Sequence, residues 1–454
     1  MRPLALGILL IPATFAATPT YSRDIAPILF KHCASCHHKD DIAPMSLLNY
    51  AETKPWAASI KEAVLTRKMP PWKADPHVGK WSNDPSLTPE QINLIKAWAD
   101  GGKPEGNPKE TPVAPVFETG WRAGKPDKIV TIPKFTLDKG GIDEYKSFEM
   151  PTDFTEDMWV VSAELRAGNR KIVHHAHVFV VEPPASDPGP VKAAASPDPV
   201  RKYAEWLKLR EGSLAWVRTE APVINDGCVV DDNAVFPGTV KSDLALLISS
   251  YLPGRAPDIY PEGTARLVKA GSKLRFTIHY ARTTGKPEFD ETAVGLIFAK
   301  APPRTVARRI DLSNHMFLIP AGAPNQEVTE CHTFTKDMYI TSLTPHMHLR
   351  GKAMKMELTY PDGKTATILD VPEYNFNWQI TYRTADPIYL PTGTRIRITA
   401  HFDNSKNNPL NPAPEKIIRW GDASENEMMD GWIEYVDAKD VPTKPVPAAA
   451  ELRR

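Results

Sequence analysis

Proline is the residue that most restricts how this chain can fold. The 454-residue sequence contains 45 prolines, close to twice the ~5% found in an average protein. Proline lacks a backbone N–H and clashes with the preceding turn of a helix, so it interrupts helix interiors and central strands. The count therefore disfavours a mostly helical bundle and favours short strands joined by many loops.

Composition and charge narrow the classes of protein further. Hydrophobic residues make up 42% of the chain, which is enough for sizeable cores and excludes global disorder. The 55 basic and 55 acidic residues cancel, so the charge gives no reason to expect nucleic acid as a partner. At roughly 100–200 residues per domain, the length predicts about three domains.

The N-terminus has the layout of a secretory signal peptide. Arg2 precedes an apolar run from Leu4 to Ile11, and the small residues Thr14, Ala16 and Ala17 follow, so residues 1–16 are predicted to be the signal. The apolar run is too short to span a bilayer, and no later stretch reaches that length. We predict an exported protein, in a bacterial periplasm, with no membrane span; a buried N-terminal helix is the alternative.

Residues 18–103 are predicted to form a small helical domain that binds haem. Within it, Cys33-Ala34-Ser35-Cys36-His37 is a C-x-x-C-H motif, in which Cys33 and Cys36 can attach haem c covalently and His37 can bind the iron. A zinc half-site and a redox dithiol are the alternatives. A second ligand pair with zinc spacing is missing from the sequence, and the signal peptide favours haem.

The sixth ligand of the haem iron is predicted to be Met69, which lies in Arg67-Lys68-Met69-Pro70-Pro71-Trp72. Met45 and His77 are the alternatives. This stretch resembles class I cytochrome c domains, and the resemblance implies a methionine ligand in a proline-containing loop and an external electron donor to the haem. The proline-rich residues 104–126 are predicted to be a linker.

Short β-type runs separated by turn residues begin near residue 127, and examples are Lys171–Val181, Lys273–Tyr280 and Arg395–His401. They predict all-β sandwich architecture. The expected fold class is thus multidomain, a small α-helical cytochrome c domain followed by two all-β, jelly-roll-like sandwiches. The sandwiches are expected at 127–302 and 303–440, with a flexible tail at 441–454.

Histidines gather at three places in this β-type region. His174 and His175 lie in the run Lys171–Val181, and His279 lies in the run Lys273–Tyr280. His346 and His348 lie two positions apart, which places them on one face of a strand. Imidazole suits zinc, copper, iron or nickel, so this pattern indicates metal binding. A polar strand face is the alternative. The histidines His177, His315, His332 and His401 are given no role.

The ordered set of His174-His175, His279-Tyr280, His346-Met347-His348 and Glu427-Met428-Met429 resembles one family. It is the copper type II, ascorbate-dependent monooxygenases, to which peptidylglycine α-hydroxylating monooxygenase and dopamine β-monooxygenase belong. The likeness covers about residues 127–440. It implies two β-sandwich domains with one copper each, and a reaction in which dioxygen hydroxylates a C–H bond.

The resemblance also implies the ligands of the two copper ions. His174, His175 and His279 correspond to the ligands of the electron-transfer copper. His346, His348 and Met428 correspond to the ligands of the oxygen-activating copper, with Met429 as the alternative to Met428. Ascorbate supplies electrons in the family, and here the fused haem is the expected replacement.

Some positions depart from the family pattern. Thr344 stands where the peptidylglycine enzyme has an arginine that helps to hold its substrate, and Trp432 stands where it has a tyrosine. A peptidylglycine substrate is therefore not expected, and the substrate stays unknown. Two other functions remain open, a periplasmic electron-transfer or copper-binding protein without monooxygenase activity, and a zinc hydrolase.

Two cysteines lie outside the haem motif. Cys228 and Cys331 are predicted to form one long-range disulfide, and two buried thiols are the alternative.

Overall fold

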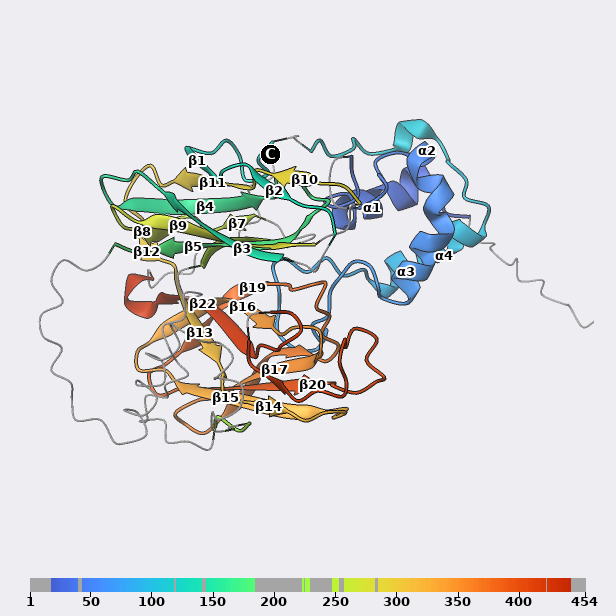
Figure 1. The fold of residues 1–454 in the computed structure, drawn as a ribbon. Helices are drawn as coiled ribbons and strands as arrows, with labels where there is room; N and C mark the ends of the chain where they lie inside the picture. The colour runs from blue at the N-terminus through green and yellow to red at the C-terminus, as the bar shows by residue number, and fades with distance from the viewer. Residues whose placement is uncertain are drawn as a thin grey trace, which may run out of the picture. The chain divides into compact units, whose positions relative to one another are not determined.

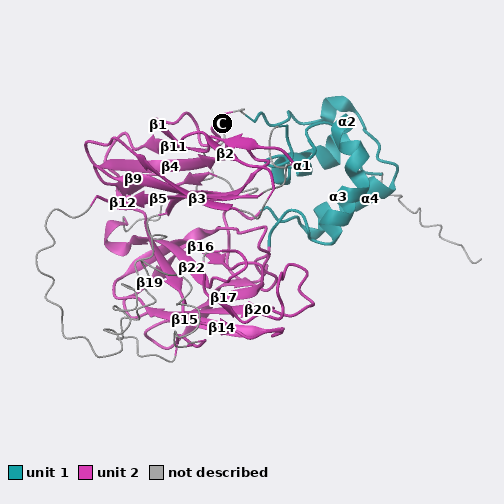
Figure 2. Ribbon diagram, viewed as in Figure 1, with its two compact units in different colours: residues 1–72, 85–117 teal, residues 73–84, 118–454 magenta. Residues whose placement is uncertain are grey.

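The structure is a computed structural model. It describes residues 18–39, 43–117, 120–140, 144–183, 223, 225–228, 247–252, 257–281, 285–421 and 423–441. The chain forms two compact units, Met1–Trp72 with Pro85–Phe117 and Lys73–Asp84 with Glu118–Arg454 (Figure 2). The chain therefore passes between the units three times. The sequence predicted one linker, at 104–126. The structure has a connection there, between residues 117 and 118, and two more at the ends of the segment 73–84.

Unit 1 contains short helices. They are η1 (Tyr21–Ile25), α1 (Ala26–His32), α2 (Tyr50–Thr53), η2 (Lys54–Trp56), α3 (Ala57–Leu65), α4 (Pro89–Asp100) and η3 (Pro108–Glu110). A capping box begins α4, because the Thr88 side chain accepts from the Gln91 N–H and the Gln91 side chain accepts from the Thr88 N–H. Ile25, Leu29 and Trp98 are fully buried in the core of this unit.

Unit 2 begins with two sheets, which we call the N-terminal pair (Figure 1). One has the order β1-β11-β4-β8-β12, with β7 beside β4, and the other has the order β3-β9-β5-β6. The strands are β1 (Lys128–Thr131), β11 (Ala293–Phe298), β4 (Met158–Arg166), β8 (Thr264–Val268), β12 (Thr305–Val306), β7 (Asp258–Ile259), β3 (Glu144–Pro151), β9 (Lys273–Tyr280), β5 (Val173–Val181) and β6 (Leu247–Tyr251). A small sheet joins β10 (Glu288–Asp290) to β2 (Phe135–Leu137). Buried side chains from both large sheets, such as Val160, Leu296, Val178 and Phe276, form one core.

Two further sheets, the C-terminal pair, have the orders β13-β22-β16-β19 and β15-β20-β17-β18. Their strands are β13 (Arg308–Ser313), β22 (Asp430–Asp437), β16 (Met338–His346), β19 (Tyr382–Leu390), β15 (Gln326–Thr333), β20 (Arg395–Phe402), β17 (Gly351–Thr359) and β18 (Thr365–Val371). β14 (Leu318–Ile319) pairs with β21 (Ile418–Arg419), and η5 spans Ala438–Asp440. Burial alternates along β20, as expected for a strand with one face on a core.

The predicted fold class is wrong. Strands hold 39% of the structure and helices only 13%, and a helical cytochrome c domain is not evident among the described residues. The α-helices among the described residues are 4 to 12 residues long. Proline is one physical reason, because Pro27 lies in the first turn of α1 and Pro55 separates α2 from α3. The strands assigned to two sandwich domains also fall together in one compact unit.

The segment Lys73–Asp84 is attached to the C-terminal pair. The Asp75 N–H donates to the Asp370 carbonyl at 2.8 Å, and the Ser82 N–H donates to the Arg383 carbonyl at 2.9 Å. Trp81 forms an isolated bridge with Thr384. The chain that leaves the Met69 loop is therefore fixed to β18 and β19.

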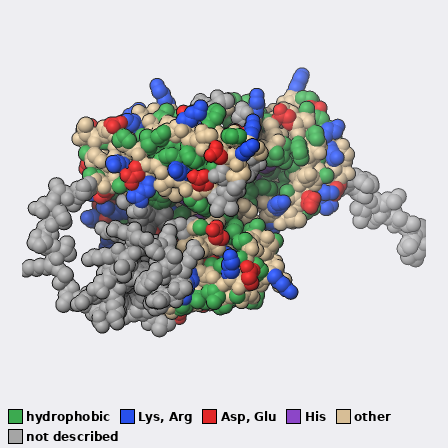
Figure 3. Space-filling view, viewed as in Figure 1, with side chains coloured by type: hydrophobic (Ala, Val, Ile, Leu, Met, Phe, Trp, Pro, Cys, Tyr) green, Lys and Arg blue, Asp and Glu red, His purple; other side chains and the backbone are tan. Residues whose placement is uncertain are grey.

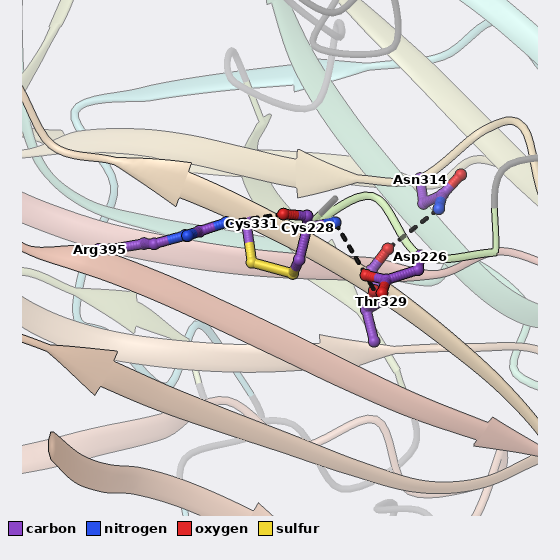
Figure 4. Close-up of a disulfide and its surroundings, with 6 residues drawn as sticks. All are labelled: Asp226, Cys228, Asn314, Thr329, Cys331 and Arg395. Atoms are coloured by element: carbon purple, nitrogen blue, oxygen red, sulfur yellow. Dashed lines mark hydrogen bonds between the residues drawn. A yellow bond between two sulfur atoms is a disulfide. The ribbon is translucent and has the colours of Figure 1, made fainter. Parts of the chain in front are cut away.

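A disulfide joins Cys228 to Cys331, whose Cα atoms are 4.9 Å apart (Figure 4). The Arg395 guanidinium donates to the Cys228 carbonyl at 2.8 Å, and the Asp226 carboxylate accepts from the Thr329 hydroxyl at 2.6 Å. These contacts hold the short described segment 225–228 against β15 and β20.

The surface charges and the lengths of the helices bear on two expectations from the sequence. On the face drawn in Figure 3, the basic and acidic side chains of the described residues are interspersed rather than gathered by sign. In the described part of the chain, every helix is too short or too polar to cross a membrane.

Candidate metal centre

The first histidine set is built on two neighbouring strands. His174 and His175 lie on β5, and His175 is directly opposite His279 on β9. Consecutive residues of a regular strand face opposite sides of a sheet, but the register between β5 and β9 shifts between Val173 and His175. This irregularity lets both neighbouring imidazoles approach His279.

The three imidazoles of this set converge through Nδ1. The Nδ1 atoms of His174 and His175 are 3.2 Å apart, and those of His279 and His175 are 3.4 Å apart. One ligand nitrogen from each residue lies within 4.8 Å of the other two. Nitrogens this close fit a shared ion, and the structure thus brings together the three residues that the sequence predicted.

Burial keeps His175 in the neutral form that can bind a metal. It lowers the pKa of His175 well below the usual value, and the neighbouring histidines His177, His279 and His174 add to the effect. An imidazole must be neutral to bind a metal, so protons do not compete strongly at neutral pH. The phenol ring of Tyr145 stacks on His279 with 4.3 Å between the ring centroids.

The second set lies at the end of β16. His346 is the last residue of that strand and pairs with Asp430 of β22, while His348 is in the turn that follows. Their ring centroids are 5.3 Å apart and the rings are nearly perpendicular. Both side chains are almost completely buried.

Hydrogen bonds fix which nitrogen each imidazole of this set presents. His346 Nδ1 lies 2.8 Å from Gln379 Oε1, and the Gln379 amide nitrogen donates to the Phe376 carbonyl at 3.2 Å. His348 Nδ1 lies 3.3 Å from the Asn426 carbonyl. Both Nδ1 atoms therefore face acceptors and carry the proton, which leaves Nε2 of each ring available to an ion.

Burial also lowers the pKa values of this set. It brings the pKa of His346 to about 4 and that of His348 to about 3, against an ordinary histidine value of 6.5. The hydrogen bond from Gln379 opposes the shift of His346 only partly. Both imidazoles are accordingly neutral at neutral pH.

Glu427 is a buried carboxylate that ties the second set together. It accepts from the backbone N–H of His348 at 2.7 Å and from that of Arg350 at 2.6 Å. Burial raises the pKa of Glu427 to about 8, while these N–H groups and the Arg350 guanidinium act in the opposite direction. Arg350 is itself fully buried and donates to Asn404 Oδ1 at 2.8 Å.

The methionines beside Glu427 differ in burial. Met428 is half-buried, whereas Met429 is completely buried in the core. The Glu427 carboxylate also accepts from the Met428 backbone N–H. The preference for Met428 over Met429 as a ligand stays a prediction.

The C-x-x-C-H motif forms a turn at the end of α1. The Cys33 N–H donates to the Leu29 carbonyl at 2.9 Å, and the N–H groups of Cys36 and His37 donate to the Cys33 carbonyl at 3.1 and 3.0 Å. The motif therefore winds Cys33, Cys36 and His37 into one helical turn. Burial lowers the pKa of His37, which favours the neutral imidazole.

The three candidates for the sixth haem ligand lie in different surroundings. Met69 is half-buried and its N–H donates to the Ala63 carbonyl at 3.1 Å. Met45 packs, like Cys33, against the core of unit 1. His77 is exposed and belongs to the segment of unit 2. The choice of Met69 stays a prediction.

Several residues near the two histidine sets were not predicted to act there. His177 Nδ1 lies 2.9 Å from the Ser250 hydroxyl, and its ring centroid is 5.5 Å from that of His175. Gln379 and Glu427 contact the second set. The remaining histidines lie elsewhere, His315 stacked on Trp420, His332 beside Phe334 and His401 near Glu327.

Comparison with known proteins places the chain in no family. A scan of family descriptions finds none that matches. A search of curated proteins also finds no match. The family resemblance of the sequence therefore stays a hypothesis.

Solved structures give only remote likenesses. The major capsid protein P2 from bacteriophage PM2 has 10% identity and a TM-score of 0.25, over 67% of this chain and 97% of its own. The structure of PNGF-II has 11% identity and a TM-score of 0.27, over 68% of this chain and 65% of its own. Neither likeness bears on function.

Proposed function

We propose that this protein is an exported copper-dependent monooxygenase. It hydroxylates a C–H bond of an unidentified substrate with dioxygen, and a c-type haem attached to the same chain relays electrons from an external donor. The observation that carries the proposal is the convergence of three imidazoles, from His174, His175 and His279, each of which places one ligand nitrogen within 4.8 Å of the other two.

The donor atoms fit two copper ions. The first set offers three imidazole nitrogens, and the second offers Nε2 of His346 and of His348 together with the thioether of Met428. Imidazole is a good ligand of copper, and a soft thioether favours Cu(I). When bound, copper supplies one-electron chemistry and the activation of dioxygen.

The contribution of the protein at the second set is to hold its ligands. Gln379 and the Asn426 carbonyl keep the proton on Nδ1 of each imidazole, so each ring keeps one tautomer and one orientation. Glu427 fixes the backbone between His348 and Arg350. The surrounding burial excludes bulk water, which protects reactive oxygen chemistry from side reactions.

Thr344 supports a substrate other than a peptide carboxylate. It is buried on β16 and its hydroxyl donates to the Thr381 hydroxyl at 2.8 Å. A neutral, internally bonded side chain offers no charge to a carboxylate. The class of substrate is otherwise open.

Copper analysis of single variants tests the proposal. The protein should bind two copper ions, and His174→Ala should lose the first while His348→Ala loses the second, each with an affinity loss above about tenfold. The control is His401→Ala, near the end of β20, which should bind both copper ions. Binding of zinc in preference to copper, or loss of both ions in either variant, would contradict the proposal.

Dioxygen consumption separates the enzyme from a copper-binding or electron-transfer protein. The reduced, copper-loaded protein should consume dioxygen, and His348→Ala should abolish this while His401→Ala does not. A reduced parent protein that leaves dioxygen untouched would favour the non-enzymatic alternative.

A covalent haem is the second expected feature. Protein matured with haem should keep one haem per chain after acid–acetone extraction, because Cys33 and Cys36 both form thioether bonds. Cys36→Ser should lower the retained haem strongly, and Ser35→Ala should not. Complete extraction of haem from the parent protein would show that the motif has another use.

A further inference from the structure

The two histidine sets belong to different sheet pairs but face a common group of aromatic side chains. The ring centroid of Phe376 lies 6.3 Å from that of His174 and 6.0 Å from that of His348. One phenyl ring thus lies between a member of the first set and a member of the second. A wide, water-filled gap between the sets is excluded on this side.

Trp432 makes a second connection between the sets. Its indole stacks on His346 with 4.8 Å between the ring centroids and a 16° angle between the planes. The same indole lies 6.4 Å from the His177 ring, which lies 5.5 Å from His175. Four neighbouring rings, those of His175, His177, Trp432 and His346, therefore connect the first set to the second.

The contact around Trp432 is dry. Phe179 of β5, Leu247 of β6 and Trp432 of β22 form a hydrophobic cluster, and each is at most 7% exposed. Figure 1 shows β5 and β22 in neighbouring layers of unit 2. The cluster buries apolar surface from both sheet pairs, which favours the state in which they touch.

Polar contacts on the rim join the same two pairs. The Tyr145 hydroxyl shares a 2.7 Å hydrogen bond with Ser424, while its ring stacks on His279. The Arg383 guanidinium donates to the Ile259 carbonyl at 2.8 Å.

We propose that the two histidine sets form one closed two-copper centre, in which Phe376 and the His177–Trp432 contact carry a single electron from the first ion to the second. The proposal rests on the proposed function, because it needs copper in both sets. One Cu(I) loses an electron and one Cu(II) gains it; no bond forms or breaks and no proton moves. The haem, reduced by an external one-electron donor, replaces the electron.

The positive charge of Arg309 near Trp432 disfavours oxidation of the indole to a radical. The Arg309 guanidinium lies 4.6 Å from the centroid of the indole ring. A cation against the ring face stabilises the neutral indole and opposes removal of an electron from it. The electron therefore tunnels across packed rings, without oxidising Trp432, and the sheet pairs need not separate for the transfer.

Electron paramagnetic resonance of the full chain, loaded with haem and two Cu(II) ions, tests this. Copper ions separated by one or two aromatic rings broaden each other's signals through dipolar coupling. We expect this broadening in the parent protein and not in His348→Ala, which holds one copper and the same haem. Two bound Cu(II) ions without magnetic interaction would overturn the closed centre and leave the proposed function intact, whereas fewer than two ions would overturn both.

Two leucine variants test what closes the centre. Leu247→Ala weakens the Trp432 cluster without touching either histidine set, and should reduce the dipolar broadening. Leu296→Ala is the matched control, since Leu296 is equally buried but lies in the core of the N-terminal pair. Tyr145→Phe, which removes the exposed bond to Ser424, gives a second variant with little risk to folding. Equal broadening in all three would show that Trp432 and Tyr145 do not hold the pairs together.

Discussion

Replacing Glu427 with alanine is expected to empty the His346/His348 site of copper and to lower the free energy of unfolding by about 2–4 kcal/mol, because two buried N–H groups lose their acceptor. The fully buried Arg350 guanidinium would also lose a neighbouring carboxyl group that favours its charged form. The N–H groups of His348 and Arg350 would lose their acceptor inside the protein. Urea unfolding and copper analysis measure the two effects.

The matched control for this variant is Glu164→Ala. Glu164 is 4% exposed, accepts from the Ala123 N–H at 3.0 Å and pairs with Arg122, but it lies on β4 of the N-terminal pair. Its loss should cost less, because Arg122 is partly exposed, and it should spare copper at the second site. Full copper affinity in Glu427→Ala would show that Glu427 only stabilises the fold.

The sequence predicted the imidazoles better than the groups that orient them. His174 and His175 are adjacent and His346 and His348 are two apart, so local spacing marked them as candidate metal binders, and the family resemblance implied their division into two copper sites. Gln379 and Glu427 reach the second set from 33 and 79 residues away, as measured from the histidine that each contacts. A contact of this kind depends on how β16 and β22 pair, which periodicity does not reveal.

The fold class that the sequence predicted is wrong, although His174, His175 and His279 do lie together. Alternating apolar residues located several strands, for example Lys273–Tyr280, because a half-buried strand has a period of two. The order of strands within sheets and the grouping of both halves in one unit depend on long-range pairing. Within the predicted helical domain, the structure has a π-helical turn at Tyr21–Ile25 and then α1, with proline in its first turn.

Trp432 illustrates a different limit of sequence reasoning. The sequence marked it only as a departure from a family pattern. Its stacking on His346 and its approach to His177 come from two strands of different sheet pairs. Both contacts depend on the tertiary structure and cannot be inferred from sequence spacing. Trp432, which the sequence marked only as a replacement of the family's tyrosine, is therefore a candidate connection between the two proposed metal sites.

The metal-free protein is expected to lose about 2 kcal/mol of stability relative to His346→Gln when the pH falls from 8 to 5. Burial lowers the pKa of His346 to about 4 in the folded state, and the unfolded value is about 6.5. Between these values the unfolded chain binds more protons than the folded one. The stabilising preference for neutral His346 is therefore complete above about pH 6.5 and declines as the pH falls toward 4.

The comparison with the variant isolates His346 from other titrating groups. Burial raises the pKa values of Glu427 and Glu330 to about 8, which makes the folded state more stable as the pH falls from 8 and opposes the histidine effect. Both glutamates are present in parent and variant, so their contribution cancels in the difference. Urea midpoints at several pH values give that difference, and Phe376→Leu, which removes no titratable group from the same site, should differ from the parent by a constant amount. Parallel curves for the parent and His346→Gln would mean that His346 takes up its proton equally easily in the folded and unfolded chain, and the buried, neutral imidazole inferred for the second site would then be wrong.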